Sequence, residues 1–213
     1  MGRENKLGMI KICGIKDINT ATIAINAGAN ALGFVFAKSS RKIFPENAKK
    51  IIQNLPKNIL RVGVFVNAPI SIVKEIAEFC DLTALQFHGT ENVDYCRQYK
   101  RKIIKAIKVS ESGQLFPHPE SYKGVVKYFL SDTYQIGTEG GTGKIFPWKN
   151  LETIKKYGLT ILAGGLNPNN VFRALSMTNP WGVDVSSGVE TMGCKDEIKI
   201  KEYMEEIQRW KNG

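Results

Sequence analysis

Eight short runs rich in β-branched and aromatic residues recur along this 213-residue chain, and stretches with helical spacing of apolar residues separate them. Successive runs start roughly 18 to 33 residues apart, the length that a strand and a returning helix need together. This repetition favours a parallel sheet whose strands alternate with helices. The predicted strands are residues 9–13, 31–36, 60–66, 84–88, 102–109, 127–132, 160–165 and 182–187.

Residues that favour helix starts lie between these runs. Asp17 is expected to cap the first helix with its carboxylate. Pro45 and Pro69 are expected to open the next two helices, because proline suits a first helical position. Asn167 is predicted to cap a helix that begins at Pro168.

Eight strand–helix units in 213 residues predict a compact (β/α)₈ barrel in a single α/β domain. An open, doubly wound sheet is the alternative arrangement of the same elements. The choice matters for function, since a barrel carries its chemistry at the C-terminal ends of its strands. The sequence has no linker or low-complexity segment, which agrees with one domain.

The formal net charge is +10, from 30 basic and 20 acidic residues. Such a balance suits nucleic acid, an anionic surface or an anionic small substrate. The basic residues are spread along the chain, which disfavours a nucleic-acid partner. No apolar run approaches the about 20 residues of a membrane helix, and the N-terminus MGRENKLG has no signal-peptide pattern, so we expect a cytoplasmic protein. The four cysteines, Cys13, Cys80, Cys96 and Cys194, lack C-x-x-C spacing and are expected to be reduced thiols.

Two loops after the late strands favour a phosphate site. AGGLNP places Gly164 and Gly165 before a helix, and DVSSGVE places Ser187 and Gly188 before a short turn. Glycine lets backbone N–H groups approach a phosphate closely, and a helix N-terminus adds a favourable dipole. Barrels frequently bind phosphate with the loops after strands seven and eight. The alternative is that these glycines only form tight turns.

A third glycine-rich segment, GTEGGTGK at residues 137–144, follows the sixth strand. Its glycines Gly140, Gly141 and Gly143 do not fit the spacing G-x-x-x-x-G-K-[ST] of a nucleotide-binding loop. We predict instead a lid loop over the substrate, or a further phosphate contact.

Cys13 and Asp132 end the first and sixth predicted strands. A thiol and a carboxylate that face one substrate can act as base and acid. The alternatives are a cysteine that packs as a small apolar residue and an aspartate that caps the next segment.

Arg41 lies in the polar loop AKSSRKIF, where a guanidinium can hold a carboxylate in bidentate fashion. A solvated basic loop is the alternative. His88 ends the fourth strand, but the chain has one other histidine, His118, and no carboxylate cluster near either, which disfavours a metal site.

The motifs KICGI, GFVFAKSSR, VGVFVN, LQFHG, LSDT, GGTGKIFPW, AGGLNPNNV and VDVSSGVE occur in this order. Together they resemble the phosphoribosylanthranilate isomerases of tryptophan biosynthesis, from about Met9 to the C-terminus. Phe87 stands where that family often has leucine. The resemblance implies a (β/α)₈ barrel over residues 9–213, which is the catalytic domain, and a short extension over residues 1–8.

The implied reaction is the Amadori rearrangement of N-(5-phosphoribosyl)anthranilate to 1-(o-carboxyphenylamino)-1-deoxyribulose 5-phosphate. The resemblance implies general acid–base catalysis without a redox cofactor or metal. It also implies a phosphorylated small molecule as the binding partner, and a monomer or a homodimer. Competing hypotheses are another phosphate-binding barrel enzyme and a non-catalytic barrel that binds phosphate or nucleic acid.

The resemblance also assigns roles to individual residues. Asp132 corresponds to the general acid, and Cys13 to the general base. Arg41 corresponds to the group that holds the anthranilate carboxylate. The remaining implied site residues are the phosphate-binding Gly164, Gly165, Ser187 and Gly188, and the pocket residues His88 and Asp184.

Overall fold

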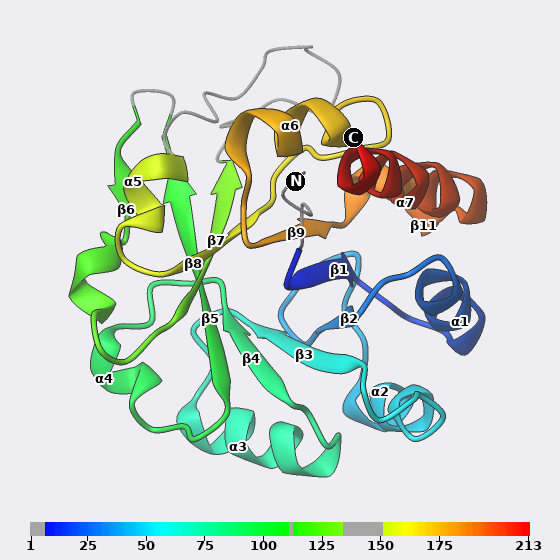
Figure 1. Ribbon diagram of the computed structural model, residues 1–213. Helices are drawn as coiled ribbons and strands as arrows, with labels where there is room; N and C mark the ends of the chain where they lie inside the picture. The colour runs from blue at the N-terminus through cyan, green and yellow to red at the C-terminus, as the bar shows by residue number, and fades with distance from the viewer. Residues whose placement is uncertain (1–6, 111–112, 134–150) are drawn as a thin grey trace.

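Eight parallel strands form the centre of a computed structural model of the chain, which describes residues 7–110, 113–133 and 151–213 (Figure 1). Polar residues and glycines follow most of these strands at their C-terminal ends. The barrel strands are β1 (Met9–Cys13), β2 (Ala31–Val35), β3 (Leu60–Phe65), β4 (Ala84–Phe87), β5 (Lys102–Val109), β7 (Tyr128–Thr133), β8 (Leu159–Leu162) and β9 (Gly182–Val185).

The sheet closes on itself. Hydrogen-bonded neighbours follow the order β4-β3-β2-β1-β9-β8-β7-β5, and β4 also pairs with β5 in parallel. This closure confirms the predicted (β/α)₈ barrel and excludes the open doubly wound sheet. All eight predicted strands are present, but β8 and β9 end earlier than expected. Gly164 and Gly165 have φ values of 79° and 67°, which stop the extended chain after β8, and a 3₁₀ helix at Ser187–Val189 follows β9.

Helices form an outer layer around the strands (Figure 1). The Asp17 carboxylate accepts a hydrogen bond of 2.8 Å from the Thr20 amide, as predicted for a helix cap. Pro45 is the first helical residue of its helix, also as predicted, whereas Pro69 lies one residue before its helix. The helices are α1 (Ile18–Asn26), α2 (Pro45–Ile52), α3 (Ile70–Phe79), α4 (Val93–Cys96), α5 (Leu151–Lys155), α6 (Val171–Thr178) and α7 (Glu197–Asn212).

The predicted start of α6 was wrong. The helix begins at Val171 instead of Pro168, because the preceding residues form a turn. The Asn167 side chain accepts a hydrogen bond from the Asn169 amide at 2.9 Å, and the Asn167 amide donates to Asn170 Oδ1 at 2.9 Å. Asn167 therefore stabilises the turn before the helix and does not cap the helix itself.

The fifth unit also differs from the predicted repeat. Between β5 and β7 the described residues contain no α-helix; they contain a short strand, β6 (Leu115–Phe116), and a 3₁₀ helix at Pro119–Tyr122. β6 runs antiparallel to β5. A second addition is the antiparallel hairpin of β10 (Glu190–Thr191) and β11 (Cys194–Lys195), which precedes α7. Within the described ranges, no helix has the length and apolarity needed to cross a bilayer.

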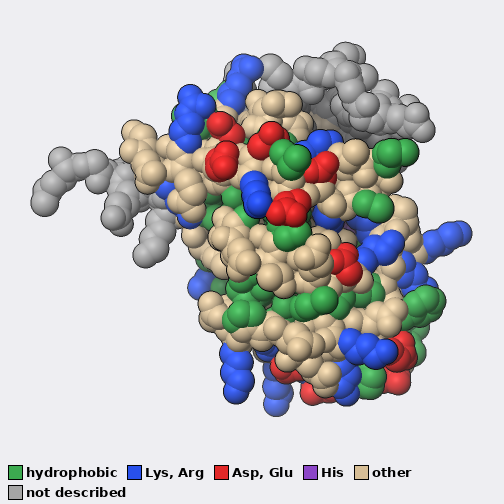
Figure 2. Space-filling view, turned by 90° about the vertical axis from the view of Figure 1, so that its right-hand side faces the viewer, with side chains coloured by type: hydrophobic (Ala, Val, Ile, Leu, Met, Phe, Trp, Pro, Cys, Tyr) green, Lys and Arg blue, Asp and Glu red, His purple; other side chains and the backbone are tan. Residues whose placement is uncertain are grey.

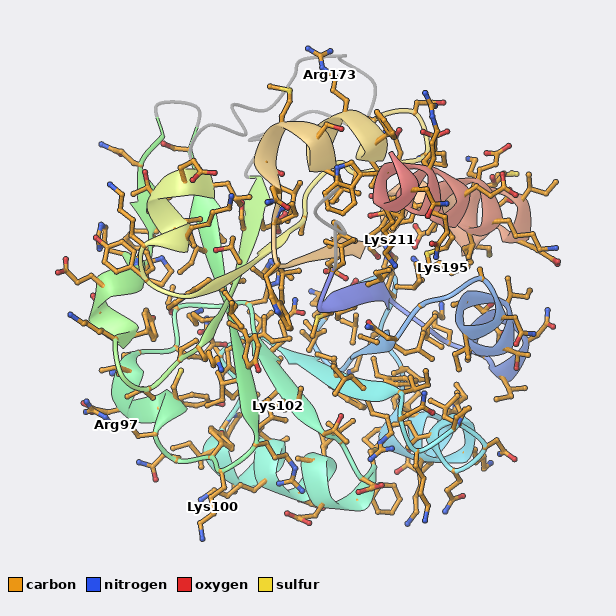
Figure 3. All side chains as sticks on the ribbon, in the orientation of Figure 1. Arg97, Lys100, Lys102, Arg173, Lys195 and Lys211 are labelled. Carbon is orange, nitrogen blue, oxygen red and sulfur yellow. The ribbon has the colours of Figure 1, made fainter. Side chains whose placement is uncertain are left out.

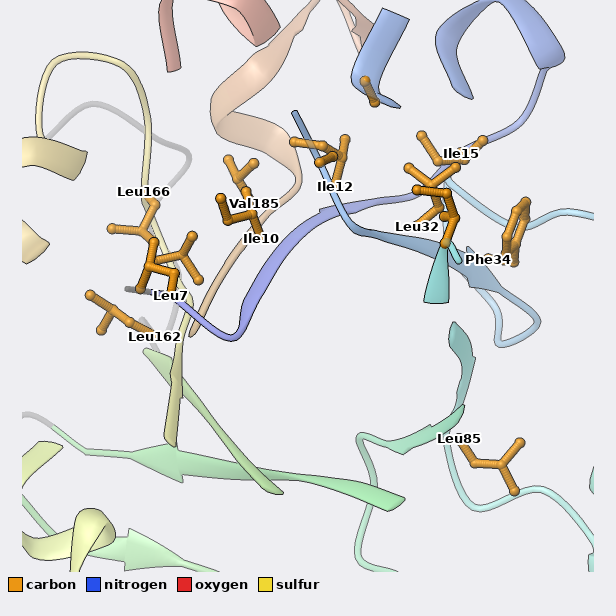
Figure 4. Close-up of a cluster of buried hydrophobic side chains, with 14 of the residues drawn as sticks. Leu7, Ile10, Ile12, Ile15, Leu32, Phe34, Leu85, Leu162, Leu166 and Val185 are labelled. Atoms are coloured by element: carbon orange, nitrogen blue, oxygen red, sulfur yellow. The ribbon is translucent and has the colours of Figure 1, made fainter. Parts of the chain in front are cut away.

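Apolar side chains pack on both sides of the barrel wall. The larger cluster lies between strands and helices and includes Ile10, Ile12, Leu32, Phe34 and Val185 (Figure 4). A smaller cluster fills part of the barrel interior. Because side chains alternate along a strand, most strands contribute to both clusters; β9 contributes only to the outer one. The interior cluster consists of Met9, Ala31, Val62, Ala84, Ile104, Ala106, Leu130, Ile161 and Ala163.

A buried ion pair fixes the loops after β3 and β4. Lys105 Nζ lies 3.0 Å from Glu91 Oε2, and the two side chains are 0% and 1% exposed. The ammonium also donates to the carbonyls of Phe87 and Gly89, at 3.1 and 2.8 Å. The Glu91 carboxylate accepts from the amides of Asn67 and Gly89, at 2.7 and 3.0 Å. These contacts hold the segment that carries His88.

We expect Lys105→Met to reduce the free energy of unfolding by about 3–5 kcal/mol, because it leaves the Glu91 carboxylate buried without a cation. Urea denaturation of both proteins measures the difference. The matched control is Lys102→Met on the same strand (Lys102 is labelled in Figure 3), where the lysine is exposed. Its free energy of unfolding should change by no more than about 0.5 kcal/mol. Equal losses in the two variants would contradict a special role for the buried pair.

Candidate active site

The end of β1 presents a thiol and an ammonium to the barrel interior. Lys11 and Cys13 are two residues apart on one strand, so their side chains share a face. The Lys11 side chain is 0% exposed, and its Nζ lies 2.9 Å from Oδ1 of Asp184. Asp184 is the residue opposite Lys11 in the pairing of β1 with β9. The cation therefore lies deep in the barrel with its counter-ion on the next strand.

Gly33 on β2 makes room for both side chains. It is the residue opposite Cys13 in the β1–β2 pairing. A Cβ atom at Gly33 would lie 2.7 Å from Cys13 Sγ and 3.0 Å from Lys11 Nζ. Any larger residue would displace one of the two groups, so the glycine allows the ammonium to extend alongside the thiol.

The surroundings of Cys13 change the pKa of its thiol in opposite directions. Burial raises the pKa of the thiol, the charge and hydrogen bond of Lys11 lower it, and the Asp184 carboxylate raises it. The balance leaves the pKa above its ordinary value. For Lys11, burial is the largest single effect and favours the neutral amine, but the charges and hydrogen bonds of Asp184 and Cys13 together outweigh it and the pKa rises. The result is a largely protonated thiol beside a stable ammonium.

Asp132 on β7 forms a contact with the end of β4. His88 Nε2 lies 2.9 Å from Asp132 Oδ2, and Gln86 Nε2 lies 3.1 Å from the other ring nitrogen, Nδ1. With the Gln86 amide donating to Nδ1, the ring hydrogen of neutral His88 resides on Nε2 and points at the carboxylate. The Asp132 side chain is 33% exposed, so it is open to a substrate.

Asp184 interacts electrostatically with both pairs of side chains, Lys11 and Cys13 on β1 and Asp132 and His88 at the ends of β7 and β4. Its charge acts on Cys13 and Lys11, and the charges of Asp132 and His88 act on Asp184. The structure thus brings the predicted residues Cys13, Asp132, His88 and Asp184 to the same end of the barrel. The predicted strand bounds placed Cys13, His88 and Asp132 at strand ends, whereas Asp184 was implied only by the family resemblance and lies within β9. Closure of the sheet brings the strand ends together.

Arg41 lies beside β1 but is already paired. Its Nε donates to Glu190 Oε1 at 2.7 Å, and its Nη2 donates to Oε2 at 2.6 Å. The side-chain stem packs over Gly14, where a Cβ atom would lie 2.8 Å from Arg41 Cδ. The hydrogen bond with Glu190 raises the pKa of the guanidinium. One bidentate edge of Arg41 is therefore occupied within the protein, which the sequence did not predict.

Glu190 also binds a second cation. Lys195 Nζ lies 2.6 Å from Glu190 Oε1 and donates to the Ser186 carbonyl at 2.9 Å. Figure 3 places Lys195 on the side of the barrel near α7. The Ser186 hydroxyl donates to the Cys13 carbonyl at 3.0 Å. This chain of contacts connects the β10–β11 hairpin to the end of β1.

The two predicted phosphate loops touch each other. A Cβ atom at Gly188 would lie 1.7 Å from the carbonyl oxygen of Leu166, so no other residue fits there without moving the loops apart. Among the described residues, the Gly164 and Gly165 amides donate no hydrogen bond. The Gly165 carbonyl accepts a hydrogen bond from the Asn170 side chain at 2.9 Å. With respect to the described residues, this leaves backbone donors available in the loop between β8 and α6.

A family model of N-(5'-phosphoribosyl)anthranilate isomerase matches residues 10–206. The isomerase of Desulforudis audaxviator is 48% identical over 197 residues, which cover 92% of this chain and 96% of that protein. The solved isomerase of Thermotoga maritima is 37% identical, with a TM-score of 0.85 over 94% of this chain and 98% of that chain. A third structure, 35% identical with a TM-score of 0.82 and the same coverage, is the isomerase with reduced 1-(o-carboxyphenylamino)-1-deoxyribulose 5-phosphate.

This chain belongs to the phosphoribosylanthranilate isomerase family. The prediction from the motifs is confirmed, and with it the assignment as an isomerase of tryptophan biosynthesis that forms 1-(o-carboxyphenylamino)-1-deoxyribulose 5-phosphate. Phe87, where the family often has leucine, faces the outer layer. Its ring centroid lies 5.1 and 5.2 Å from those of Tyr95 and Tyr99. The phenylalanine that replaces leucine therefore packs in an aromatic cluster away from the isomerase site.

Two predictions for the isomerase fall on residues that the structure describes incompletely. The predicted lid glycines Gly140, Gly141 and Gly143 lie outside the described residues. The predicted extension, residues 1–8, is described only at Leu7 and Gly8. Leu7 is 7% exposed within the core, and the Gly8 amide donates to the Trp181 carbonyl at 2.8 Å. In residues 7–110, 113–133 and 151–213, no group of three or more His, Cys, Asp or Glu is arranged for a metal ion.

Sequence reasoning missed four residues of the isomerase site: Lys11, Gln86, Glu190 and Lys195. Lys11 carried a signal, because a lysine two residues before Cys13 in an apolar strand must share the inward face. Gln86 carried the same signal relative to His88. Glu190 had none, since its partner Arg41 lies 149 residues earlier in the chain.

Glu190 predicts a pH dependence of stability. Burial raises the pKa of its carboxyl, but the hydrogen bonds from Arg41 and Lys195 outweigh burial and lower the pKa below its ordinary value. The folded isomerase therefore favours the carboxylate, and this stabilisation is present above the unfolded pKa, near 4.3. It is lost as the pH falls through the lower folded pKa.

We expect the difference in unfolding free energy between the wild type and Glu190→Gln to be constant from about pH 7 to 5 and to shrink below about pH 4.3. Urea titrations of both proteins at each pH measure this difference. Glu197→Gln is the control, because Glu197 is paired only at the surface of α7. If the difference in unfolding free energy between the wild type and Glu190→Gln does not depend on pH, Glu190 is not the ionised partner of Arg41 and Lys195.

Proposed function

We propose that the enzyme performs its rearrangement with Asp132 as general acid and Cys13 as general base. The observation that carries this proposal is their placement at the C-terminal ends of β7 and β1, with Asp184 electrostatically coupled to both. Site chemistry at this end of the strands agrees with barrel enzymes in general.

In the first step Asp132 gives its proton to the furanose ring oxygen. The bond between that oxygen and the anomeric carbon breaks, and the nitrogen lone pair forms an iminium. Asp132 is left as a carboxylate. The His88 Nε2–H, 2.9 Å away, donates to this carboxylate and stabilises the charge that proton donation creates. His88 thus favours the transfer without touching the ring oxygen itself.

In the second step Cys13 removes the proton from the neighbouring sugar carbon. The electron pair of that C–H bond forms a double bond to the anomeric carbon, and the iminium nitrogen becomes a neutral amine. The resulting enolamine tautomerises to the ketone. The pKa of Cys13 lies above its ordinary value, so little thiolate is present at neutral pH. A weak base suffices because the adjacent iminium acidifies the C–H bond.

The phosphate is proposed to lie against Gly164, Gly165, Ser187 and Gly188. The Gly164 and Gly165 amides donate to no acceptor in the described part of the chain, which supports this, since an anion needs backbone donors that are not already in use. The close contact of Gly188 with Leu166 holds the two loops together. Anchoring the substrate at this end positions the sugar carbons beside the acid and the base.

Arg41 is proposed to bind the anthranilate carboxylate through its free edge. Glu190 occupies Nε and Nη2, and among the described residues Nη1 has no hydrogen-bond partner. Glu190 fixes the plane of the guanidinium, so the two N–H groups of Nη1 donate in fixed directions within that plane. His88 and Asp184 complete the pocket as proposed substrate-facing groups.

The proposed partner is this phosphorylated substrate, and the proposed assembly is a monomer or a homodimer. The Thermotoga maritima relative is a dimeric isomerase that has also been solved as generated monomers. The face turned toward the viewer in Figure 2 has basic and acidic side chains interspersed. A cytoplasmic location, the absence of nucleic-acid and membrane partners, and catalysis without a cofactor stay predictions from the sequence.

Cys13→Ala and Asp132→Asn should each lower kcat by about 10²- to 10⁴-fold, because each removes one proton-transfer group. The assay generates phosphoribosylanthranilate and follows the loss of anthranilate fluorescence on rearrangement. Cys194→Ala is the control, since Cys194 is an exposed thiol, and the activity of this variant should be unchanged. Full activity in Cys13→Ala would assign the base to another residue. No activity in the wild type would favour a non-catalytic phosphate-binding barrel.

Arg41→Ala should raise KM about 10- to 100-fold, which is the effect of losing a hydrogen bond to a charged group worth about 1.5–3 kcal/mol. Steady-state fluorescence assays measure KM and kcat for this variant and for Lys42→Ala, an exposed neighbour that serves as control. An aniline analogue of the substrate, which lacks the carboxylate, should show the same KM with the wild type and Arg41→Ala. A KM unchanged for the natural substrate would place the carboxylate elsewhere.

A further inference from the structure

We propose that Lys11 is a positioning residue that sets the basicity of Cys13 by holding a fixed ammonium beside its sulfur. The inference rests on the proposed role of Cys13 as the base. It adds a residue that touches neither substrate nor reacting carbon, and that acts only through the thiol.

Burial and pairing with Asp184 confine the Lys11 ammonium to a position beside the Cys13 thiol. Lys11 Nζ and Cys13 Sγ both lie within 3.0 Å of the point where a Cβ of Gly33 would stand, and the Lys11 side chain is fully buried. Its one carboxylate partner, Asp184 at 2.9 Å, lies on the neighbouring strand. Inaccessible and paired, Lys11 is not itself placed to take a proton from a substrate. It is placed to stabilise a thiolate.

The remaining charges around Cys13 come from three other elements. Asp184 on β9 disfavours the thiolate, whereas Lys195 on β11 favours it. Arg41, after β2, interacts with the thiol electrostatically and is neutralised by Glu190. Beyond Asp184 lie Asp132 and His88. The apolar contacts, Val35 and Val64, add no charge. Lys11 is the cation that both contacts the thiol and shares its strand.

This arrangement gives the two partners of the buried pair opposite effects on one thiol. Removing the Lys11 charge should raise the pKa of Cys13, and removing the Asp184 charge should lower it. A lysine that served only to pack the barrel interior would not produce shifts of opposite sign. The sign therefore separates an electrostatic role from a structural one.

The test is the pH dependence of alkylation of Cys13 by iodoacetamide, followed by mass spectrometry of the peptide that contains it. The thiolate is the reactive form, so the midpoint of the rate reports the pKa of the thiol. Limited access to a 7% exposed residue lowers every rate but leaves the midpoint in place. The exposed Cys194 in the same digest is the internal control.

In Lys11→Met the Cys13 midpoint should rise by about one pH unit or more, which cuts the thiolate fraction at pH 7 about tenfold. In Asp184→Asn it should fall. Because Lys11→Met leaves a buried carboxylate without a partner and risks unfolding, Lys11→Met/Asp184→Asn is compared with Asp184→Asn. These two proteins differ only at residue 11, and the double variant should have the higher midpoint. Equal midpoints in that comparison would overturn the proposal.

The acid limb of the kcat–pH profile separates this inference from the proposed function. If Cys13 is the base, the limb should move with the alkylation midpoint in each variant. A midpoint that moves while the limb stays would retain the effect of Lys11 on the thiol and remove Cys13 as the base. If neither the acid limb of the kcat–pH profile nor the alkylation midpoint of Cys13 shifts in Lys11→Met, the proposed role of Lys11 is wrong.

Discussion

Closure of the sheet through hydrogen bonds between β4 and β5 is the constraint on which the other features depend. A closed ring gives every strand an inner and an outer face, and the alternation of side chains assigns each residue to one of them. The inner face of an eight-stranded barrel has room only for side chains. Its polar residues therefore contact one another, and Lys11 meets Asp184 across neighbouring strands.

Among the described residues, Lys11 and Lys105 are both buried, with different consequences. Lys105 lies on the outer face of β5, and its ion pair with Glu91 stabilises loops. Lys11 lies on the inner face of β1, where its charge acts on the Cys13 thiol. Both require a carboxylate, because an ammonium without one is costly to bury. The same residue type thus supports the scaffold in one place and the site in the other.

Much of the fold followed from the sequence because it depends on local patterns. The runs that became β1 and β5 were predicted with their observed bounds, and Asp17 was predicted to cap α1. The segment after β5 was harder, since a 3₁₀ helix and the short strand β6 occupy the place of an expected helix. The start of α6 was misjudged because the asparagine side chains of a turn imitate a helix cap.

The site was predictable to the extent that its residues end strands. Cys13, His88 and Asp132 follow apolar runs, and a barrel brings such positions together. The pairing of Arg41 with Glu190 was not predictable, because it joins segments that only the closed fold makes neighbours. Lys11 and Gln86 were predictable in principle from strand alternation, which places them on the same faces as Cys13 and His88.

The hydrogen bond from Ser186 to the Cys13 carbonyl connects the proposed phosphate-binding loop to the proposed base. Ser186 immediately precedes the proposed phosphate-binding Ser187, so the loop proposed to bind the substrate phosphate is hydrogen-bonded to the strand that carries the proposed base. This contact fixes the separation between the proposed phosphate site and the Cys13 sulfur. In the proposed binding mode, a sugar phosphate one carbon longer or shorter would therefore place a different C–H bond at the sulfur.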